Sequence, residues 1–291
     1  MTQTLLVLGS ANADLVVEVG RRPAGGETVL GGDTVVLPGG KGANTAVAAA
    51  RVGASVSLVG ALGGDGYGSL LRESLESSGV GTALVKTSQR PTGIAYITVT
   101  PDGENSIVVS PGANSDVLQS DVDGLDLDGV AVLTCSLEVP LETVIHAIGV
   151  AAGHGVRPVL NLSPVAELPA DTLRQLSVLI VNEHEAAQLA SDWADLLKLG
   201  PSAAIVTLGS RGAAVVEASG ITEVPSIEVA EVVDTTGAGD AFAGALSARL
   251  AEGDDLVPAA RYAARVAALS VTKAGAQPSY PTAAEVSAAA G

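Results

Sequence analysis

The sequence is short of cysteine, aromatic residues and cations, and each shortage excludes a class of protein. The single cysteine among 291 residues, Cys135, can form neither an internal disulfide nor a cysteine-based metal cluster. Aromatic residues make up 2% of the chain, so the core must be built from Ala, Val and Leu. Only 15 Lys and Arg stand against 32 Asp and Glu, a net charge of −17 that argues against a surface for nucleic acid or anionic membrane.

Long apolar runs are missing as well. The first apolar stretch, residues 4–8, has no basic run before it and ends at Gly9, too early for a signal peptide or a membrane span. We therefore expect a cytoplasmic protein with no membrane partner. A chain of 291 residues, 47% of them apolar, can bury a substantial core, and no linker divides it. We predict one domain over residues 1–291.

Short apolar runs alternate with helical patterns along most of the chain. This alternation predicts an α/β fold, a doubly wound and mostly parallel sheet flanked by helices. The expected strands of this sheet are 5–8, 56–59, 131–133, 159–162, 178–181 and 204–207, followed by a hairpin of 213–217 and 221–224. The expected helices are 46–52, 67–78, 140–152, 170–176, 183–190 and 258–272.

A second, smaller sheet is expected apart from the main one. Residues 15–19 and 33–37 read as strands with no helix between them, and 92–99 with 106–109 read as a hairpin. The pattern predicts a small antiparallel sheet, built from about 12–38 and 92–110, that serves as a lid. Its exposed edges would pair with a second copy of the chain, so we expect a homodimer through the lid.

The stretch 232–246 carries the clearest chemical signal. It is a glycine-containing loop that runs into a helix of small residues, with Asp240 in the first turn. Unpaired N–H groups at such a turn bind an anion, and we expect an anion hole at Gly237, Ala238, Gly239 and Asp240. A carboxylate here makes sense if a hydroxyl must lose a proton while the N–H groups stabilise a transferred phosphoryl group. The motif predicts phosphoryl transfer to an alcohol, with Asp240 as the general base.

The glycine-rich loop 38–45 is a candidate ligand loop. It is not a Walker A motif, because Gly42 follows Lys41 and Val35 stands where the first glycine should be. Its glycines would bring the backbone close to a small ligand, and Lys41 and Asn44 offer several donors, a combination that fits a polyhydroxylated molecule. The alternative is a glycine-rich entrance to the next helix.

Polar side chains follow several predicted strands. Asn12 and Asp14 follow the first strand and Glu138 follows the strand at 131–133, at the edge where ligands gather in open α/β sheets. Turn caps or an exposed loop charge would explain them equally well. Asn182 and Glu185 lie at the predicted start of a helix. They could lie near a hydrated Mg²⁺, or they could cap the helix reciprocally.

Two further loops have both a functional and a plain interpretation. The turn 207–212, with a hydroxyl and a guanidinium, could hold a nucleotide or simply join two strands. The loop 273–279 exposes carbonyl oxygens that suit a cation, or it only ends a helix.

Together these stretches resemble the PfkB carbohydrate kinase family over nearly the whole chain. One family signature is similar to residues 39–44 with the helix to Gly53, and the other is similar to residues 234–242, in the right order. The stretches 9–14, 112–114 and 161–164 resemble the members that phosphorylate ribose. The chain is shortened between Glu185 and Ala204 relative to those members.

The resemblance implies a full set of site residues. The sugar would be bound by Asn12, Asp14, Gly40, Lys41, Gly42, Ala43, Asn44, Glu138 and Asp240. ATP would be bound by Asn182, Thr207, Leu208, Gly209, Ser210, Arg211, Gly212 and Gly239. An activating K⁺ would be held by Asp234, Thr236, Ser270, Lys273, Gly275 and Ser279, mostly through carbonyls, and the Mg²⁺ of ATP would lie near Asn182 and Glu185.

The implied reaction is the ATP-dependent phosphorylation of D-ribose at its 5-hydroxyl, giving ribose 5-phosphate and ADP. Two alternatives stay open. The first is a kinase of the same family acting on fructose, adenosine or pseudouridine. The second is a non-catalytic sugar-sensing protein on the same fold.

Overall fold

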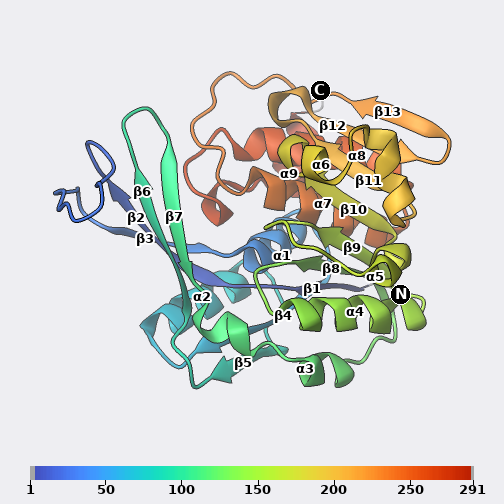
Figure 1. Cartoon of the computed structure of the whole chain (residues 1–291), viewed down its shortest axis with the longest axis horizontal. Helices are drawn as coiled ribbons and strands as arrows, with labels where there is room; N and C mark the ends of the chain where they lie inside the picture. Colours follow the sequence, from blue (N-terminus) through green and yellow to red (C-terminus); the bar gives the residue numbers. More distant parts are fainter. Residues whose placement is uncertain (1–3, 290–291) are drawn as a thin grey trace.

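The computed structural model describes residues 4–289 (Figure 1). Within them the main sheet has nine strands in the order β13-β12-β11-β10-β9-β8-β1-β4-β5. Its ladders are parallel from β5 to β11, and only β12 and β13 at one edge are antiparallel. The strands are β1 (Thr4–Leu8), β4 (Val56–Gly63), β5 (Val85–Ser88), β8 (Val130–Ser136), β9 (Arg157–Asn161), β10 (Val178–Asn182), β11 (Ala204–Thr207), β12 (Ala213–Glu217) and β13 (Gly220–Val224).

Helices cover both faces of this sheet, as the alternation predicted. Alternate residues of β1 show why, because Leu5 and Val7 join one buried cluster while Leu6 and Leu8 join the other. The first cluster includes residues of α1 (Lys41–Arg51), α2 (Gly66–Ser77), α7 (Ala238–Glu252), α8 (Leu256–Ser270) and α9 (Ala283–Ala288). The second includes residues of α3 (Gln119–Asp123), α4 (Leu141–Gly153) and α6 (Glu183–Leu189), and α5 (Ala170–Gln175) packs beside it.

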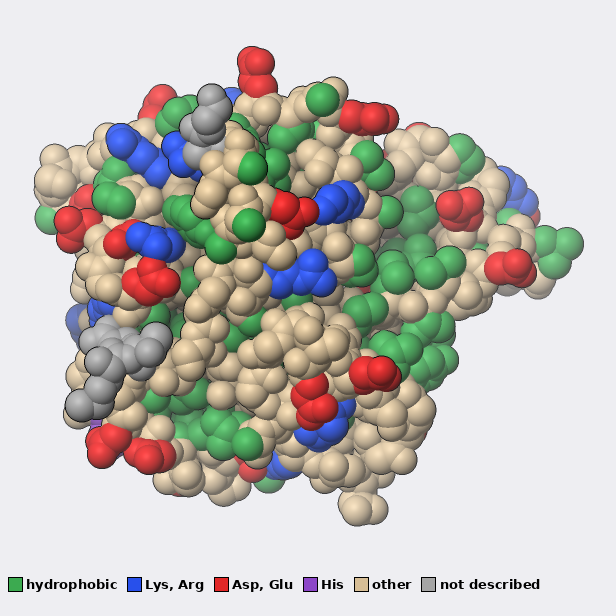
Figure 2. Space-filling view, turned by 180° about the vertical axis from the view of Figure 1, so that it is seen from behind, with side chains coloured by type: hydrophobic (Ala, Val, Ile, Leu, Met, Phe, Trp, Pro, Cys, Tyr) green, Lys and Arg blue, Asp and Glu red, His purple; other side chains and the backbone are tan. Residues whose placement is uncertain are grey.

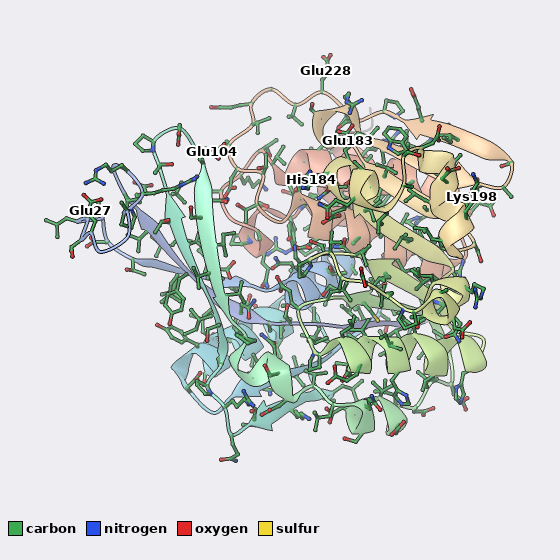
Figure 3. The ribbon with its side chains drawn as sticks, viewed as in Figure 1. Glu27, Glu104, Glu183, His184, Lys198 and Glu228 are labelled. Atoms are coloured by element: carbon green, nitrogen blue, oxygen red, sulfur yellow. The ribbon has the colours of Figure 1, made fainter. Side chains whose placement is uncertain are left out.

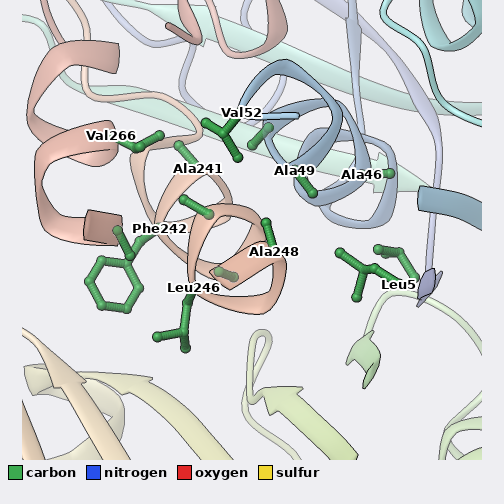
Figure 4. Packing of buried hydrophobic residues seen from close by; sticks show 14 of the residues in the cluster. Leu5, Ala46, Ala49, Val52, Ala241, Phe242, Leu246, Ala248 and Val266 are labelled. Atoms are coloured by element: carbon green, nitrogen blue, oxygen red, sulfur yellow. The ribbon is translucent and has the colours of Figure 1, made fainter. Parts of the chain in front are cut away.

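Close packing of α1 on α7 depends on small residues. Ala48 and Ala49 of α1 lie against Gly244 of α7, and Figure 4 shows Ala49 in the same buried cluster as Ala241 and Ala248 of α7. A Cβ on Gly244 would overlap a backbone carbonyl of α1, so only glycine permits this approach. The shortage of aromatic residues therefore has a structural use, because it lets the first turns of the two helices meet at the site.

The smaller sheet projects from the body in Figure 1 and has the order β3-β2-β6-β7. Its strands are β2 (Asn12–Glu18), β3 (Val35–Gly39), β6 (Gly93–Val99) and β7 (Asn105–Ser110). The prediction of an antiparallel sheet was wrong for one pair, since β2 and β6 run parallel. Both strands leave the body from the same side, with Asn12 opposite Gly93 and Glu18 opposite Val99, so they point outward together.

Several predicted boundaries also move. β2 begins at Asn12, so Asn12 and Asp14 lie on a strand rather than in a loop. Helix α1 begins at Lys41 instead of residue 46, so Lys41 and Asn44 occupy its first turn. β5, α3 and α9 were not predicted. Among residues 4–289, no helix is both long enough and apolar enough to cross a membrane.

Candidate active site

The candidate site lies where the first turns of α1 and α7 meet the carboxyl ends of the central strands. Asp240 is the third residue of α7 and is 6% exposed. Its Oδ2 accepts a hydrogen bond of 2.9 Å from Nδ2 of Asn44, in the first turn of α1. The two family signatures, separated by 196 residues in sequence, are thus joined by their side chains.

The charge on Asp240 is balanced by its neighbours. Burial raises the pKa of Asp240, whereas the ammonium of Lys41 and the hydrogen bond from Asn44 lower it, and Glu138 raises it. The net pKa lies above the ordinary value of an aspartate. Burial lowers the pKa of Lys41, but the carboxylates of Asp240, Glu138 and Glu185 outweigh this and keep the ammonium charged. A carboxylate with a raised pKa beside a fixed cation suits a general base.

The N-terminus of α7 offers fewer free donors than expected. Gly237, at φ 74°, places the chain so that the N–H groups of Gly239 and Asp240 have no acceptor within residues 4–289. The N–H of Ala238 instead donates to the carbonyl of Thr235 at 3.2 Å, so Ala238 is not a free donor. This hydrogen bond closes a tight turn before the helix. The spacing of residues in the sequence could not show that the turn forms. The hydroxyl of Tyr280 donates to the carbonyl of Gly237 at 3.1 Å and supports the turn.

The predicted sugar-side residues are brought together, and neighbours fix them. Burial, with smaller effects of Glu138 and Asp240, raises the pKa of Asp14 to about 7. A Cβ on Gly39 would overlap this carboxyl group. Oε2 of Glu138 accepts from Oγ of Ser10 at 2.5 Å and from the N–H of Lys41 at 3.2 Å.

Other members of the sugar set shape the backbone. Oδ1 of Asn12 accepts from Nδ2 of Asn114 at 2.7 Å. Gly40, at φ 89°, and Gly42 lie so close to residues 9–12 that a Cβ on either would clash. Ala43 is fully buried and its N–H donates to the carbonyl of Ser10 at 2.8 Å, so it anchors the loop.

A cavity of about 150 Å³ extends from Asp240 toward the predicted nucleotide side. Polar side chains, among them Lys41 and Asn182, line it. Its walls are formed by Lys41, Asn161, Ser163, Ile180, Val181, Asn182, Glu185, Thr207, Gly237, Gly239 and Asp240. Asn161 and Ser163 were not predicted as site residues, although their stretch carried part of the family resemblance.

The predicted nucleotide set is only partly in this cavity. Thr207 and Gly239 line it, but Leu208 is buried in the core, and Gly209, Ser210 and Arg211 form an exposed turn that ends at Gly212. Arg211 forms an ion pair with Glu183, which Figure 3 shows at the start of α6 beside His184.

Asn182 and Glu185 cap α6 reciprocally, which was the alternative to a magnesium role. The N–H of Glu185 donates to Oδ1 of Asn182, and the N–H of Asn182 donates to Oε2 of Glu185, both at 2.8 Å. Both residues still line the cavity. The cap leaves Oε1 of Glu185 without a protein donor among the described residues, so an ion held through water remains compatible with it.

Asp234 ties the anion site to the C-terminal loop. Its Oδ1 accepts from the N–H of Thr236 at 2.9 Å and its Oδ2 from the N–H of Gly275 at 2.8 Å. Burial raises the pKa of Asp234, but these hydrogen bonds hold it below the ordinary value.

Other members of the predicted cation set are engaged locally. The hydroxyls of Ser270 and Ser279 donate to carbonyls of their own turns at 2.8 Å, and the side chain of Lys273 pairs with Glu285 at 3.1 Å. Within residues 4–289 no group of three or more His, Cys, Asp or Glu side chains could hold a metal.

The side chains near Asp240 that sequence reasoning missed include Ser10, Asn114, Gln277 and Tyr280, which contact predicted site residues. The first two lie in stretches that carried the family resemblance, Gln277 lies within the predicted cation loop, and Tyr280 directly follows that loop. Their types and positions were visible, but their partners lie 43 or more residues away.

The comparisons with known proteins agree with this geometry. The model of the pfkB family of carbohydrate kinases matches residues 2–283, and the chain belongs to that family. Among curated relatives, the ribokinase of Bacillus subtilis (strain 168) is 40% identical over 289 residues, 98% of each chain. The deoxyribokinase of Salmonella typhi is 34% identical, over 96% of this chain and 95% of its own.

A solved structure gives the same result in three dimensions. The ribokinase of Arabidopsis thaliana, complexed with ribose and ATP, superposes with a TM-score of 0.90 at 32% identity. The match covers 99% of this chain and 98% of that one. The predicted α/β fold and membership of a sugar kinase family are thereby confirmed.

Proposed function

We propose that this chain transfers the γ-phosphoryl group of ATP to the 5-hydroxyl of D-ribose, giving ribose 5-phosphate and ADP. One observation carries the proposal: the buried carboxylate of Asp240 lies beside unpaired N–H groups and the Lys41 ammonium. The similarity to ribokinases over nearly the full length of both chains supports the choice of sugar.

The sugar is held on the α1 side of Asp240. Asn12, Asp14, Lys41, Asn44 and Glu138 present carboxylates, amides and an ammonium to its hydroxyls, a donor and acceptor set matched to a polyol. Since Ser10 and Asn114 already bind Glu138 and Asn12, these side chains are preorganised before the sugar arrives.

Asp240 removes the proton as the primary hydroxyl oxygen attacks the γ-phosphorus. Because Asn44 occupies Oδ2, Oδ1 is the oxygen that faces the hydroxyl. The N–H groups of Gly239 and Asp240 donate to the oxygens of the transferred group, whose charge is spread over them. The leaving ADP takes the electron pair of the broken phosphorus–oxygen bond.

ATP lies along the cavity toward Asn182 and Thr207, with the turn at 207–212 near its ribose or phosphates. Glu185 would hold the accompanying Mg²⁺ through water, because Mg²⁺ readily keeps its hydration. When bound, Mg²⁺ neutralises charge on the β- and γ-phosphates. The loop 273–279 and Asp234 would hold an activating K⁺ mostly through backbone carbonyls, since among residues 4–289 no group of three or more His, Cys, Asp or Glu side chains could hold a metal.

The lid sheet closes over the sugar and pairs with a second copy of the chain. Its edge strand β7 is exposed at every position and carries Ile107, Val108 and Val109, and apolar side chains gather on this projecting part in Figure 2. Glu27 and Glu104 lie toward the far end of the lid (Figure 3). A soluble homodimer acting in the cytoplasm fits these features.

A second substrate, 2-deoxyribose, is favoured by the similarity to a deoxyribokinase. A panel of ribose, 2-deoxyribose, fructose, adenosine and pseudouridine with coupled detection of ADP separates the candidates. We expect the highest kcat/KM with ribose. A higher value with 2-deoxyribose or a nucleoside would replace ribose as the substrate, and no ADP with any of them would favour a non-catalytic sugar sensor.

A further inference from the structure

A line of buried side chains connects Asp240 to the outside of the molecule. Oγ of Ser74 in α2 donates to Oε1 of Gln277 at 2.9 Å. Nε2 of Gln277 donates to Oδ1 of Asn44 at 3.1 Å, and Nδ2 of Asn44 donates to Oδ2 of Asp240 at 2.9 Å. We call these residues the amide chain. Gln277 and Asn44 are 2% and 5% exposed, so water does not compete for these bonds.

Each bond of the amide chain fixes the direction of the next. An amide presents a donor at one end and an acceptor at the other, and the two ends have nearly the same shape. The carboxylate of Asp240 only accepts, so it takes the NH₂ group of Asn44, whose Oδ1 then accepts from the NH₂ group of Gln277. Oε1 of Gln277 in turn accepts from the hydroxyl of Ser74 at the outer end of the chain.

We propose that Gln277 is a positioning residue for phosphoryl transfer: it holds the amide of Asn44 in the one orientation that donates to Asp240. The inference rests on the proposed role of Asp240 as the base. Without Gln277 the oxygen of the Asn44 amide loses its buried donor, and the amide is free to turn away from the carboxylate. Asp240 then loses the hydrogen bond that keeps Oδ2 occupied and Oδ1 directed at the hydroxyl.

The loop that carries Gln277 supports the same end of α7 at two more points. Gly275 donates its N–H to Asp234, and the Tyr280 hydroxyl donates to the carbonyl of Gly237. Three residues of one loop, Gly275, Gln277 and Tyr280, thus contact Asp234, Asn44 and the turn before α7. The loop is a scaffold for the catalytic end of the helix, and Gln277 is its contact to the base.

Charged or titratable groups on several elements also face Asp240 and are common to every variant below. They are Lys41 of α1, Glu138 after β8, Asp14 of β2 and Tyr280 of the C-terminal loop. Substitution of Gln277 leaves all four of these groups in place. A change in kcat or in its pH dependence therefore comes from the amide chain or from the charge of the new side chain.

Three variants separate these causes. Gln277→Met keeps the length of the side chain but removes both polar ends. Ser74→Ala removes the outermost donor at a half-buried position and changes no charge. Gln277→Glu keeps the shape but as a carboxylate cannot donate to Asn44, so Oδ1 of Asn44 loses its donor. The matched control Gln119→Glu adds the same charge at the exposed start of α3.

The first measurement is steady-state turnover of ATP with the preferred sugar. We expect Gln277→Met to lower kcat by about tenfold, the usual effect of one buried hydrogen bond, with the KM for ATP unchanged. Ser74→Ala should lower kcat less, in the same direction. In Gln277→Glu the acidic limb of the pH–kcat profile should move to higher pH, and in Gln119→Glu it should not.

The second measurement needs no turnover. In ¹⁵N–¹H spectra of the free protein, we expect the side-chain amide signals of Asn44 to shift or broaden in Gln277→Met and Ser74→Ala and to stay in place in Gln119→Glu. Unchanged Asn44 signals, or a wild-type kcat in a folded Gln277→Met, would overturn the proposal. If the wild type turns over no sugar while the Asn44 signals respond, the proposed function fails and the amide chain stands.

Discussion

Asn44 and Asp240 lie 196 residues apart in sequence and are joined by a buried hydrogen bond of 2.9 Å from Nδ2 to Oδ2. This bond connects the first turn of α1 to the first turn of α7. It also makes the two oxygens of Asp240 different, because the Asn44 amide occupies Oδ2, and we propose that Oδ1 faces the substrate hydroxyl.

Substituting Asp240→Asn removes the proposed base and keeps the shape of the side chain. We expect kcat to fall roughly 10²- to 10⁴-fold, the contribution of a positioned base, with little change in affinity for ribose. Rapid-quench or coupled assays give kcat, and calorimetry gives the affinity. The control is Asp254→Asn just beyond the far end of α7, where the carboxylate pairs with Arg249 and should not affect turnover. Near wild-type turnover in Asp240→Asn contradicts the assignment.

Asp14 should make sugar binding depend on pH near neutrality. Its pKa is raised to about 7, chiefly by burial, so its charge is lost as the pH falls through that value. A charged carboxylate accepts stronger hydrogen bonds from sugar hydroxyls than a neutral one, so the Kd for ribose should fall as the pH rises from about 6 to about 8. Calorimetric titration should show this in the wild type and a flat, weaker Kd in Asp14→Asn.

The same group should affect stability with a definite sign. Because the folded pKa of Asp14 lies above its unfolded value, the native state holds a proton that the unfolded chain has released. The contribution of Asp14 to stability is therefore present below pH about 4 and is lost as the pH rises to about 7. Denaturant midpoints should fall less steeply over this window in Asp14→Asn than in the wild type.

Gly237 and Gly253 flank α7 in the same left-handed conformation, at φ 74° and 99°. Alanine at either site should cost about 1 kcal/mol of unfolding free energy from the backbone alone. At Gly237 its Cβ would also overlap the Tyr280 hydroxyl and lie 2.7 Å from the Cβ of Ala276, whereas nothing lies near Gly253. Gly237→Ala should also lower turnover, whereas Gly253→Ala should not. Equal turnover in the two variants would show that the turn at Gly237 has no part in catalysis.

A potassium site at Asp234 and the loop 273–279 predicts faster turnover in K⁺ than in Na⁺ at equal ionic strength. Na⁺ is smaller and fits carbonyl oxygens spaced for K⁺ less well. The carboxylate of Asp234 accepts hydrogen bonds from Thr236 and Gly275 and so holds the turn before α7 and the loop 273–279 together. In Asp234→Asn the difference in turnover between K⁺ and Na⁺ should therefore shrink. Equal wild-type rates in the two salts rule out the site.

Dimerisation through the lid predicts a dimer mass by light scattering at micromolar concentration. Val108 is 68% exposed on the edge strand β7, and Val108→Lys should shift the mass to that of a monomer. Ile221→Lys is the control, because Ile221 is exposed on β13, the edge of the other sheet. A monomeric wild type, or a dimer lost only in Ile221→Lys, contradicts pairing through the lid.

The sequence alone determined the α/β alternation and the position of Asp240 in the first turn of a helix. These are local properties, because strand and helix periodicity and the glycines of a turn act over a few residues. The same local reasoning placed Asn12 and Asp14 near the site but put them in a loop, since it could not show where β2 would pair.

Only the tertiary structure decided that β2 and β6 run parallel, that the Ala238 N–H donates to Thr235, and which side chains bind Asn44. Each depends on which segments pack together across 80 or more residues, or on the exact geometry of a turn. The raised pKa of Asp14 has the same origin, because burial and the approach of Glu138 and Asp240 exist only after folding. The sequence placed Asp240 in its helix, and packing decided which of its oxygens Asn44 occupies.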